Sequence, residues 1–370
     1  MKQGPISPSY DNHEPVWPKP ARDGDVGAQG MYHANRIDDE LAHPPADWLI
    51  LTRDYATQSG DTAALEPDCA NAWYDAEKQE LHLVVPTQSP QEVAEGAATM
   101  LGKSRIGLKR LFLHPCFTVG YGSKDHCIMP YYGLVASLYG DGRPVRLAND
   151  RFDQFQTSLK RHQFSVGYIA AVDWRTGLLQ SFRVNIVANG GGRANCSVVL
   201  TMAGATSAQS VYYFPKSDVA ATAIASRAID CGAARGYGAL ETLTATELMI
   251  DEIAAALGLD PIEFRLRNVL KTGMKTTQGA IPLGTQRAEA VLEKSRAHAL
   301  WVGRGARKQA YDAAHPGKYY GVGFSGSQSR QGGTRAGWAH QAHAQRDGNR
   351  HGRVIGSGRR LRALARPAGG

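Results

Sequence analysis

The stretch from Ala233 to Asn268, AARGYGALETLTATELMIDEIAAALGLDPIEFRLRN, carries the strongest fold signal in the chain. Apolar residues recur at helical spacing between positions 240 and 257, and Gly258 is a typical helix terminator. A second helix restarts with Asp260 as N-cap, Pro261 in its first turn and a glutamate three residues after the cap. The stretch therefore predicts two consecutive helices, entered through a short glycine-containing loop.

That loop, Arg235–Gly238 (RGYG), allows two interpretations. It is either the start of an ordinary helix or a loop that holds an anionic group, because helix N-termini and arginine both favour negative charge. A nicotinamide dinucleotide site is disfavoured, since Glu241 stands where G-x-G-x-x-G requires glycine and no apolar strand leads into the loop. The residues alone leave both interpretations open.

Strands are also predicted along the chain. LHLVVP, residues 81–86, alternates as a strand does and is followed by a helix from Pro90 with Ser89 as its N-cap. Further strands are expected at 143–150, and in a hairpin with arms starting at 163 and 178. Hairpins mixed with strand-helix units predict a mixed α and β, α+β fold and not a doubly wound sheet.

Composition limits the class of protein. The 370 residues are 42% hydrophobic, enough for a large core, and contain no uninterrupted apolar run of membrane-spanning length. The opening segment is polar and proline-rich and lacks the apolar core of a signal peptide, so a cytoplasmic chain is expected. The five widely spaced cysteines form no C-x-x-C pair, which argues against an iron-sulfur cluster or a zinc ribbon and favours small buried side chains.

The positive charge is confined to one end. The net charge is +8, but residues 317–370 hold ten Lys and Arg against one acid. From Arg330 onward there are nine Arg and no Lys, with few spaced apolar residues, and such a segment cannot bury enough apolar surface to offset its chain entropy. It also has the composition of GC-rich DNA translated out of frame; a basic tail for nucleic acid or lipid and a degenerate terminal domain are the alternatives.

These patterns predict three segments: a Pro-rich lead-in or linker over 1–46, a main domain over 47–323, and an Arg/Gly-rich irregular tail over 324–370.

Two more loops could bind ligands. Gln88 lies at a strand-to-helix crossover, and Gly120 and Gly122 let neighbouring backbone N–H groups approach an anion. Each alone also fits an ordinary loop.

The order of these segments resembles a known family. ALEPDCANAWYDAEKQELHLVVPTQSPQEV, HPCFTVGYGSKD, GRPVRLANDR, RHQFSVGY and the RGYG helix entry follow one another as in the molybdenum-cofactor-binding subunit of xanthine dehydrogenases and aldehyde oxidases, the molybdenum hydroxylases. The resemblance runs from about Asp47 to Gly323 and implies the first half of their molybdopterin-binding domain, incomplete at both ends.

The resemblance also implies roles for individual residues. Gln88 would face the apical oxo ligand of molybdenum, Tyr237 would pack on the substrate ring, and no side chain would ligate the metal directly. The implied cofactor-binding positions are Gln88, Gly120, Tyr121, Gly122, Ser123 and Arg235; the implied substrate positions are Asp125, Ala203 and Tyr237. Thr118 and Val119 replace two loop glycines of the family, and Asp125 with Ala203 disfavours xanthine as the substrate.

The implied activity is hydroxylation of an aldehyde or an aromatic N-heterocycle, with water as the oxygen source. The implied cofactor is molybdopterin in a dinucleotide form, and electrons would pass to iron-sulfur and FAD partner subunits. The family's general-base glutamate lies beyond the matching region, so a second half of the molybdenum subunit is a further expected partner. The contrasting hypothesis is a truncated or frameshifted, non-catalytic remnant; a weaker one is a polyanion-binding protein that uses the basic tail.

Overall fold

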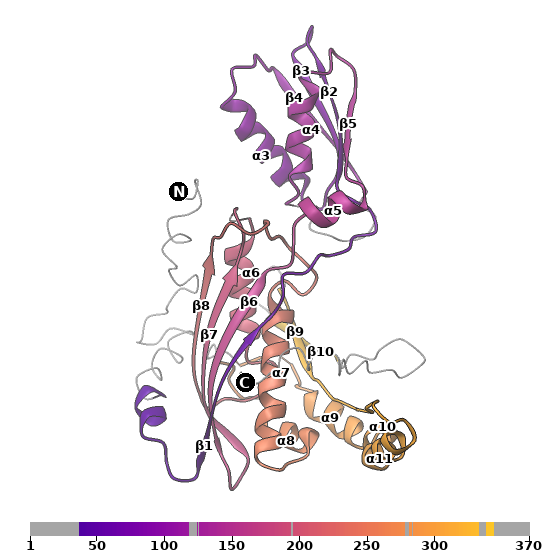
Figure 1. Cartoon of the computed structure of the whole chain (residues 1–370). Coiled ribbons are helices and arrows are strands. Elements are labelled where there is room, and N and C mark those ends of the chain that lie inside the picture. The colour runs from indigo at the N-terminus through magenta and orange to yellow at the C-terminus, as the bar shows by residue number, and fades with distance from the viewer. Residues whose placement is uncertain are drawn as a thin grey trace, which may run out of the picture.

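The computed structural model describes residues 37–117, 124, 126–193, 195–277, 281–282, 284–332 and 338–343. Two sheets with their own helices form two lobes, one above the other in Figure 1. We call the part built on the sheet β4-β3-β2-β5 the small lobe, and the part built on the sheet β1-β6-β7-β8 the large lobe. Along the sequence, β1 belongs to the large lobe, β2 to β5 form the sheet of the small lobe, and β6 to β8 complete the sheet of the large lobe.

The predicted hairpin forms the centre of the large lobe. Strands β6 (Gln163–Asp173) and β7 (Leu178–Asn189) pair antiparallel, β1 (Trp48–Ala56) adds antiparallel to β6, and β8 (Lys216–Ile224) adds parallel to β7. Alternate residues along much of both hairpin arms are buried, as a sheet with one packed face requires. The hairpin and the mixed strand directions confirm that the fold is not doubly wound.

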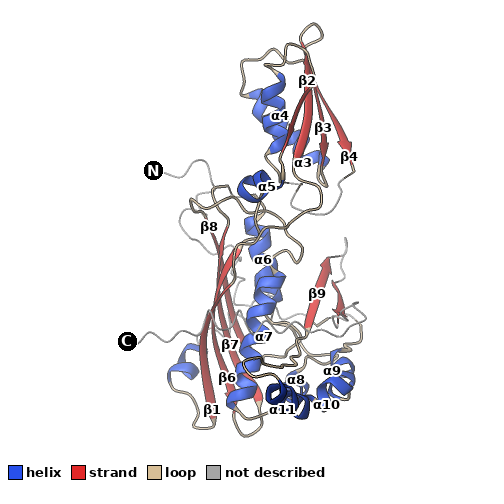
Figure 2. Ribbon diagram, turned by 45° about the vertical axis from the view of Figure 1, so that its right-hand side comes forward, coloured by secondary structure: helices blue, strands red, loops and turns tan. Residues whose placement is uncertain are grey.

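Three helices follow in the large lobe: α6 (Ser197–Ser207), α7 (Ala239–Ala256) and α8 (Pro261–Asn268). Figures 1 and 2 show α6 and α7 on the same face of the sheet. The expected apolar face of α7 is partly wrong, because Leu240 is 49% exposed. The buried face instead includes small and polar residues, and Thr242 and Thr246 donate hydrogen bonds to the carbonyl groups of Gly204 and Ala208.

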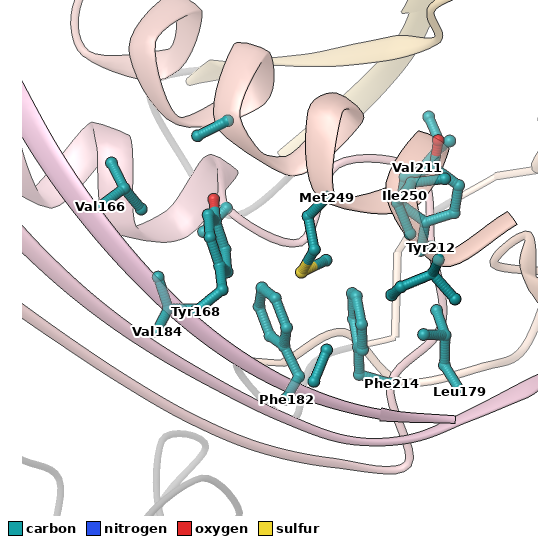
Figure 3. Packing of buried hydrophobic residues seen from close by; sticks show 14 of the residues in the cluster. Val166, Tyr168, Leu179, Phe182, Val184, Val211, Tyr212, Phe214, Met249 and Ile250 are labelled. Atoms are coloured by element: carbon teal, nitrogen blue, oxygen red, sulfur yellow. The ribbon is translucent and has the colours of Figure 1, made fainter. Parts of the chain in front are cut away.

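The core of the large lobe lies between these helices and the sheet. Figure 3 shows Tyr168 and Phe182 from the hairpin beside Phe214 and Met249. The rings of Phe182 and Phe214 stack with centroids 4.0 Å apart, and those of Tyr168 and Phe182 lie 5.5 Å apart. All four residues are at most 4% exposed, so this cluster holds α7 against the sheet.

The entry to α8 confirms its predicted cap. The Asp260 side chain accepts hydrogen bonds from the backbone N–H groups of Ile262 and Glu263. The second half of the predicted capping box does not form, because the Glu263 carboxylate is paired with Arg267 and Arg296. Charged partners on the surface compete with the cap amide for this side chain.

The small lobe contains strands β2 (Cys69–Asp75), β3 (Glu80–Pro86), β4 (Arg110–Cys116) and β5 (Val145–Ala148). Helices α3 (Pro90–Gly102) and α4 (Met129–Ser137) pack on this sheet around a core that includes Leu81, Leu83 and Val93. Ser89 is the N-cap of α3 as predicted, but its side chain makes no capping hydrogen bond. Helix α5 (Arg151–Thr157) lies between the lobes in Figure 1.

The remaining described elements lie toward the two ends of the chain. Residues 37–42 are helical, and Glu40 pairs with Lys216 of β8. Helices α9 (Ala288–Arg296), α10 (Ala299–Val302) and α11 (Arg304–Ala314) precede two strands, β9 (Ser327–Gly332) and β10 (Trp338–His343). The antiparallel pair β9–β10 differs from the irregular tail expected there, since main-chain pairing needs no apolar side chains.

Two sequence expectations concern cysteines and membranes. Cys127, Cys196 and Cys231 are buried, Cys69 is partly buried, and Cys116 is exposed. Over the described part of the chain, none of the helices combines the length and the apolar character needed to cross a bilayer.

Candidate active site at the junction of the lobes

The ends of both sheets meet at the junction of the lobes. In the small lobe β3, β4 and β5 run in the same direction and end on the side of α5. In the large lobe β6 begins, and β7 and β8 end, on the side of the small lobe. Isolated bridges join Lys160 to Asp61 and to Cys231 at this end. Loops from both lobes are thereby collected in one region, where functional side chains commonly gather.

The loop Arg235–Gly238 lies in this region, immediately before α7. Gly236, Tyr237 and Gly238 all have positive φ, at 102°, 43° and 85°. Gly238 is the position that most strictly requires glycine, because a Cβ there would lie 2.1 Å from the Leu200 carbonyl oxygen of α6. The loop is therefore a defined turn seated on α6.

Arg161 fastens this loop. Its Nη2 donates to the Arg235 carbonyl oxygen at 2.7 Å, and its Nη1 donates to Glu241 Oε1 in the first turn of α7 at 3.0 Å. Glu241 is only 2% exposed. Since Arg161 lies just before β6, one guanidinium group joins the sheet, the loop and the helix.

Arg235 presents an uncompensated charge at the junction. Its side chain is exposed and makes no ion pair with any residue that the structure describes. Other cations nearby are paired: Lys160 with Asp61 at 2.6 Å, and Arg193 with Asp230. Because Arg235 stands just before the N-terminus of the 18-residue helix α7, the helix dipole adds to its charge, an arrangement that favours anions.

Two predicted substrate positions also lie at the RGYG loop. Tyr237 is partly buried and packs against the large-lobe core. Ala203 is a half-buried residue of α6 and precedes Gly204, whose backbone lies beside Gly238. The structure thus brings Ala203 and Tyr237 into one region, although they belong to different segments of the chain.

Gln88 comes to the junction from the small lobe. It follows the C-terminal end of β3 and precedes α3, as predicted, and its side chain is exposed. The preceding Thr87 is buried, and its Oγ1 accepts a hydrogen bond from the Ser89 backbone N–H at 3.0 Å. The turn is therefore held by its own hydrogen bond, while the amide of Gln88 is left accessible.

The predicted residues Gly120, Tyr121, Gly122, Ser123 and Asp125 lie outside the described residues. Lys124, within the same segment, is described and is 1% exposed. It pairs with Glu66 at 2.6 Å, so Lys124 contacts the segment ALEPDC, residues 64–69.

His162 is a buried residue beside Arg161 that the sequence did not single out. It is fully buried, and its Nε2 lies 2.7 Å from the Ser197 Oγ at the start of α6. Burial lowers the pKa of this imidazole to about 4, so it is neutral at physiological pH. The sequence signal for His162 is its position in the motif RHQFSVGY. No short-range pattern around Arg161 or His162 predicts their contacts with α7 and α6.

Tyr131 of α4, in the small lobe, lies within electrostatic range of the large lobe. Burial raises the pKa of this phenol, and the positive charge of Arg193, after β7, acts in the opposite direction. The described residues contain no group of three or more His, Cys, Asp or Glu side chains able to hold a metal ion.

Residues 29–269 match the family model of the molybdopterin cofactor-binding domain. The chain belongs to this family. The match covers both lobes and the RGYG loop, and it confirms the predicted fold and the predicted class of cofactor.

Curated relatives of this molybdopterin cofactor-binding chain are subunits of larger enzymes. It is 26% identical over 288 residues to the nicotinate dehydrogenase large molybdopterin subunit of Eubacterium barkeri, covering 76% of the chain and 65% of that protein. It is 32% identical over 200 residues to a putative xanthine dehydrogenase molybdenum-binding subunit, XdhA, of Escherichia coli, covering 51% of the chain and 25% of that protein. The chain thus spans less than two thirds of the length of these relatives.

Solved structures share the fold of this molybdopterin cofactor-binding chain. Quinoline 2-oxidoreductase from Pseudomonas putida superposes with a TM-score of 0.65 at 23% identity, over 76% of this chain and 36% of that one. The aldehyde oxidoreductase from Desulfovibrio gigas gives a TM-score of 0.59 at 22% identity, over 72% and 28%. These likenesses show the architecture of the chain.

Proposed function

We propose that the chain binds a molybdenum cofactor at the junction of the lobes and forms part of the active site of a molybdenum hydroxylase. The observation that carries this proposal is that β3, which ends just before Gln88, and α7, which begins just after the loop Arg235–Gly238, both direct these ends toward the junction of the lobes. Family membership supports the cofactor, and the names of the relatives support an oxidoreductase.

The donor groups of the junction fit such a cofactor. Molybdopterin carries phosphate, and an exposed arginine beside a helix N-terminus is suited to phosphate. An exposed amide at Gln88 can donate or accept a hydrogen bond. When bound, the cofactor would supply the redox chemistry that transfers an oxygen atom from water to a substrate carbon.

The residues of this chain would bind and orient. Arg235 would hold negative charge, Gln88 would hydrogen-bond to a polar atom, and the ring of Tyr237 would pack against a flat substrate. Asp125 and Ala203 would border the substrate, and the short side chain of Ala203 cannot hydrogen-bond to a purine oxygen. The proposed substrates are therefore aldehydes or aromatic N-heterocycles other than xanthine.

The description of the relatives as subunits supports the proposed partners. Iron-sulfur and FAD subunits would accept the electrons, and a further polypeptide segment would supply the general base. We also propose that 47–323 is the functional unit and that residues 120–123 line the cofactor. A cytoplasmic location remains a prediction from the sequence.

Molybdenum content tests the proposal. The chain would be co-expressed with iron-sulfur and FAD partner subunits in cells that load another molybdenum hydroxylase, and the metal would be measured per purified chain. We expect close to one molybdenum per chain, and about a 10-fold loss of loading at limiting cofactor for Arg235→Met, since a hydrogen bond to a charged group contributes about 1.5–3 kcal/mol. Arg175→Met is the matched control, because Arg175 lies in the β6–β7 turn, at the end of the hairpin remote from the junction. Wild-type protein without molybdenum would contradict the proposal.

A further inference from the structure

We propose that Arg161 is a positioning residue: it fixes the direction in which Arg235 leaves the RGYG loop. The positioning role rests on the proposed function, because it assumes that Arg235 binds the cofactor. The geometry itself is given by hydrogen bonds within the chain. Arg161 bonds a main-chain carbonyl of the loop and a carboxylate of α7 with two different nitrogens. Because the carbonyl belongs to Arg235 itself, holding it fixes the α-carbon from which the exposed guanidinium extends.

The pairing of Glu241 supports a positioning role over a purely stabilising one. A guanidinium can engage both oxygens of a carboxylate in a bidentate pair. Here Arg161 bonds only Oε1 of Glu241, while Oε2 is buried without a hydrogen-bond partner among the described residues. Arg161 thus divides its two terminal nitrogens between the carboxylate and the Arg235 carbonyl, so that the one side chain ties the loop to α7.

Arg161 is itself held firmly. Its backbone N–H donates to the Gly60 carbonyl at 2.8 Å, and the next residue, His162, is fully buried. The loop in turn has two internal hydrogen bonds, from the Tyr237 N–H to the carbonyl of residue 234 and from the N–H of residue 239 to the Gly236 carbonyl, each of 2.8 Å. These two hydrogen bonds define the conformation of the turn. The hydrogen bond from Arg161 instead joins the Arg235 carbonyl to the segment that leads into β6.

The large lobe contains a matched control. Arg53 of β1 also donates to a carboxylate of α7, Glu252, at 2.5 Å and to a backbone carbonyl, that of Thr52, at 2.8 Å. It joins the same sheet to the same helix but lies away from the RGYG loop, and its side chain is 48% exposed. Replacing each arginine by lysine keeps the charge and removes the planar group that can bond two acceptors at fixed geometry.

Hydrogen-deuterium exchange on the complete chain tests the proposal. For Arg161→Lys we expect the amides of residues 235–241 to exchange about 10-fold faster than in the wild type, as the loss of a charge-assisted hydrogen bond predicts. Exchange in β6 and β7 should stay unchanged, and Arg53→Lys should leave residues 235–241 as they are. Glu241→Gln, which keeps the shape of the side chain, should give a smaller increase in the same segment.

Three results would overturn the inference: unchanged exchange at 235–241 in Arg161→Lys, an equal increase across the whole large lobe, or an equal increase in Arg53→Lys. Molybdenum loading gives a second readout, and Arg161→Lys should lower it several-fold while Arg53→Lys does not. If the wild type carries no molybdenum, the proposed function fails, and the exchange data still decide whether Arg161 positions the loop.

Discussion

Replacing Gly238 by alanine should destabilise the chain far more than the same change at Gly258. Both glycines flank α7 and both have positive φ, 85° at Gly238 and 66° at Gly258. A Cβ at Gly258 would meet nothing within 4 Å, whereas a Cβ at Gly238 would lie 2.1 Å from the Leu200 carbonyl oxygen. The pair therefore separates backbone strain from steric conflict with α6.

The magnitudes follow from these two contributions. A left-handed conformation costs an alanine about 1–2 kcal/mol, which is the whole effect expected for Gly258→Ala. Gly238→Ala adds an overpacking cost of about 1–3 kcal/mol, because the obstructing atom is backbone and cannot rotate away. We expect a total loss of about 2–5 kcal/mol in the free energy of unfolding.

Urea unfolding followed by far-ultraviolet circular dichroism measures this difference. The midpoint should fall in both variants at an unchanged m-value, and it should fall about twice as far or more for Gly238→Ala. Equal shifts in the two variants would show that the loop does not lie against α6 and would refute the geometry of the site.

Three further outcomes test the surroundings of the site. Arg265→Met, which removes a fully buried guanidinium, should cost about 3–5 kcal/mol, because it leaves a buried carboxylate unpaired, whereas Lys271→Met at an exposed pair should cost at most about 1 kcal/mol; similar urea midpoints would count against the buried network. Burial lowers the pKa of His162 from 6.5 to about 4, so the folded state binds fewer protons than the unfolded state between these pH values. The free energy of unfolding should therefore be unaffected by His162 above pH 6.5 and should fall by about 3 kcal/mol as the pH falls toward 4; a His162→Gln variant with an equally steep pH dependence would disprove this. Iodoacetamide at about pH 8 should label the exposed Cys116 and spare Cys127, whose thiol pKa is raised well above its usual value by burial; mass spectrometry showing equal labelling would contradict the fold of the small lobe.

The sequence predicts the elements whose signals are local. The hairpin centred on residues 173–178, the helix start at Pro90 and the cap at Asp260 depend on residues within a few positions of one another, and each is present. The buried face of α7 differs in part from the expected one because tertiary hydrogen bonds, such as that from Thr242 to Gly204, bury polar residues that periodicity assigns to the surface.

The site is predictable only through the order of its motifs. Nothing in the spacing of Arg161 and Glu241, 80 residues apart, shows that they form an ion pair. The packing of α7 against β6 and of α6 on the RGYG loop brings these two residues together, and both contacts are long-range. The positions 120–123 and Asp125 remain predictions, since they lie outside the described residues.

Locating the metal tests the central claim most directly. Crystals of the chain, prepared with its partner subunits from cofactor-replete cells, would be measured on both sides of the molybdenum absorption edge. We predict one anomalous peak per chain at the junction of the lobes, between the end of β3 at Gln88 and the loop Arg235–Gly238. A peak elsewhere on the chain, or no peak in crystals whose protein contains molybdenum, would contradict the account.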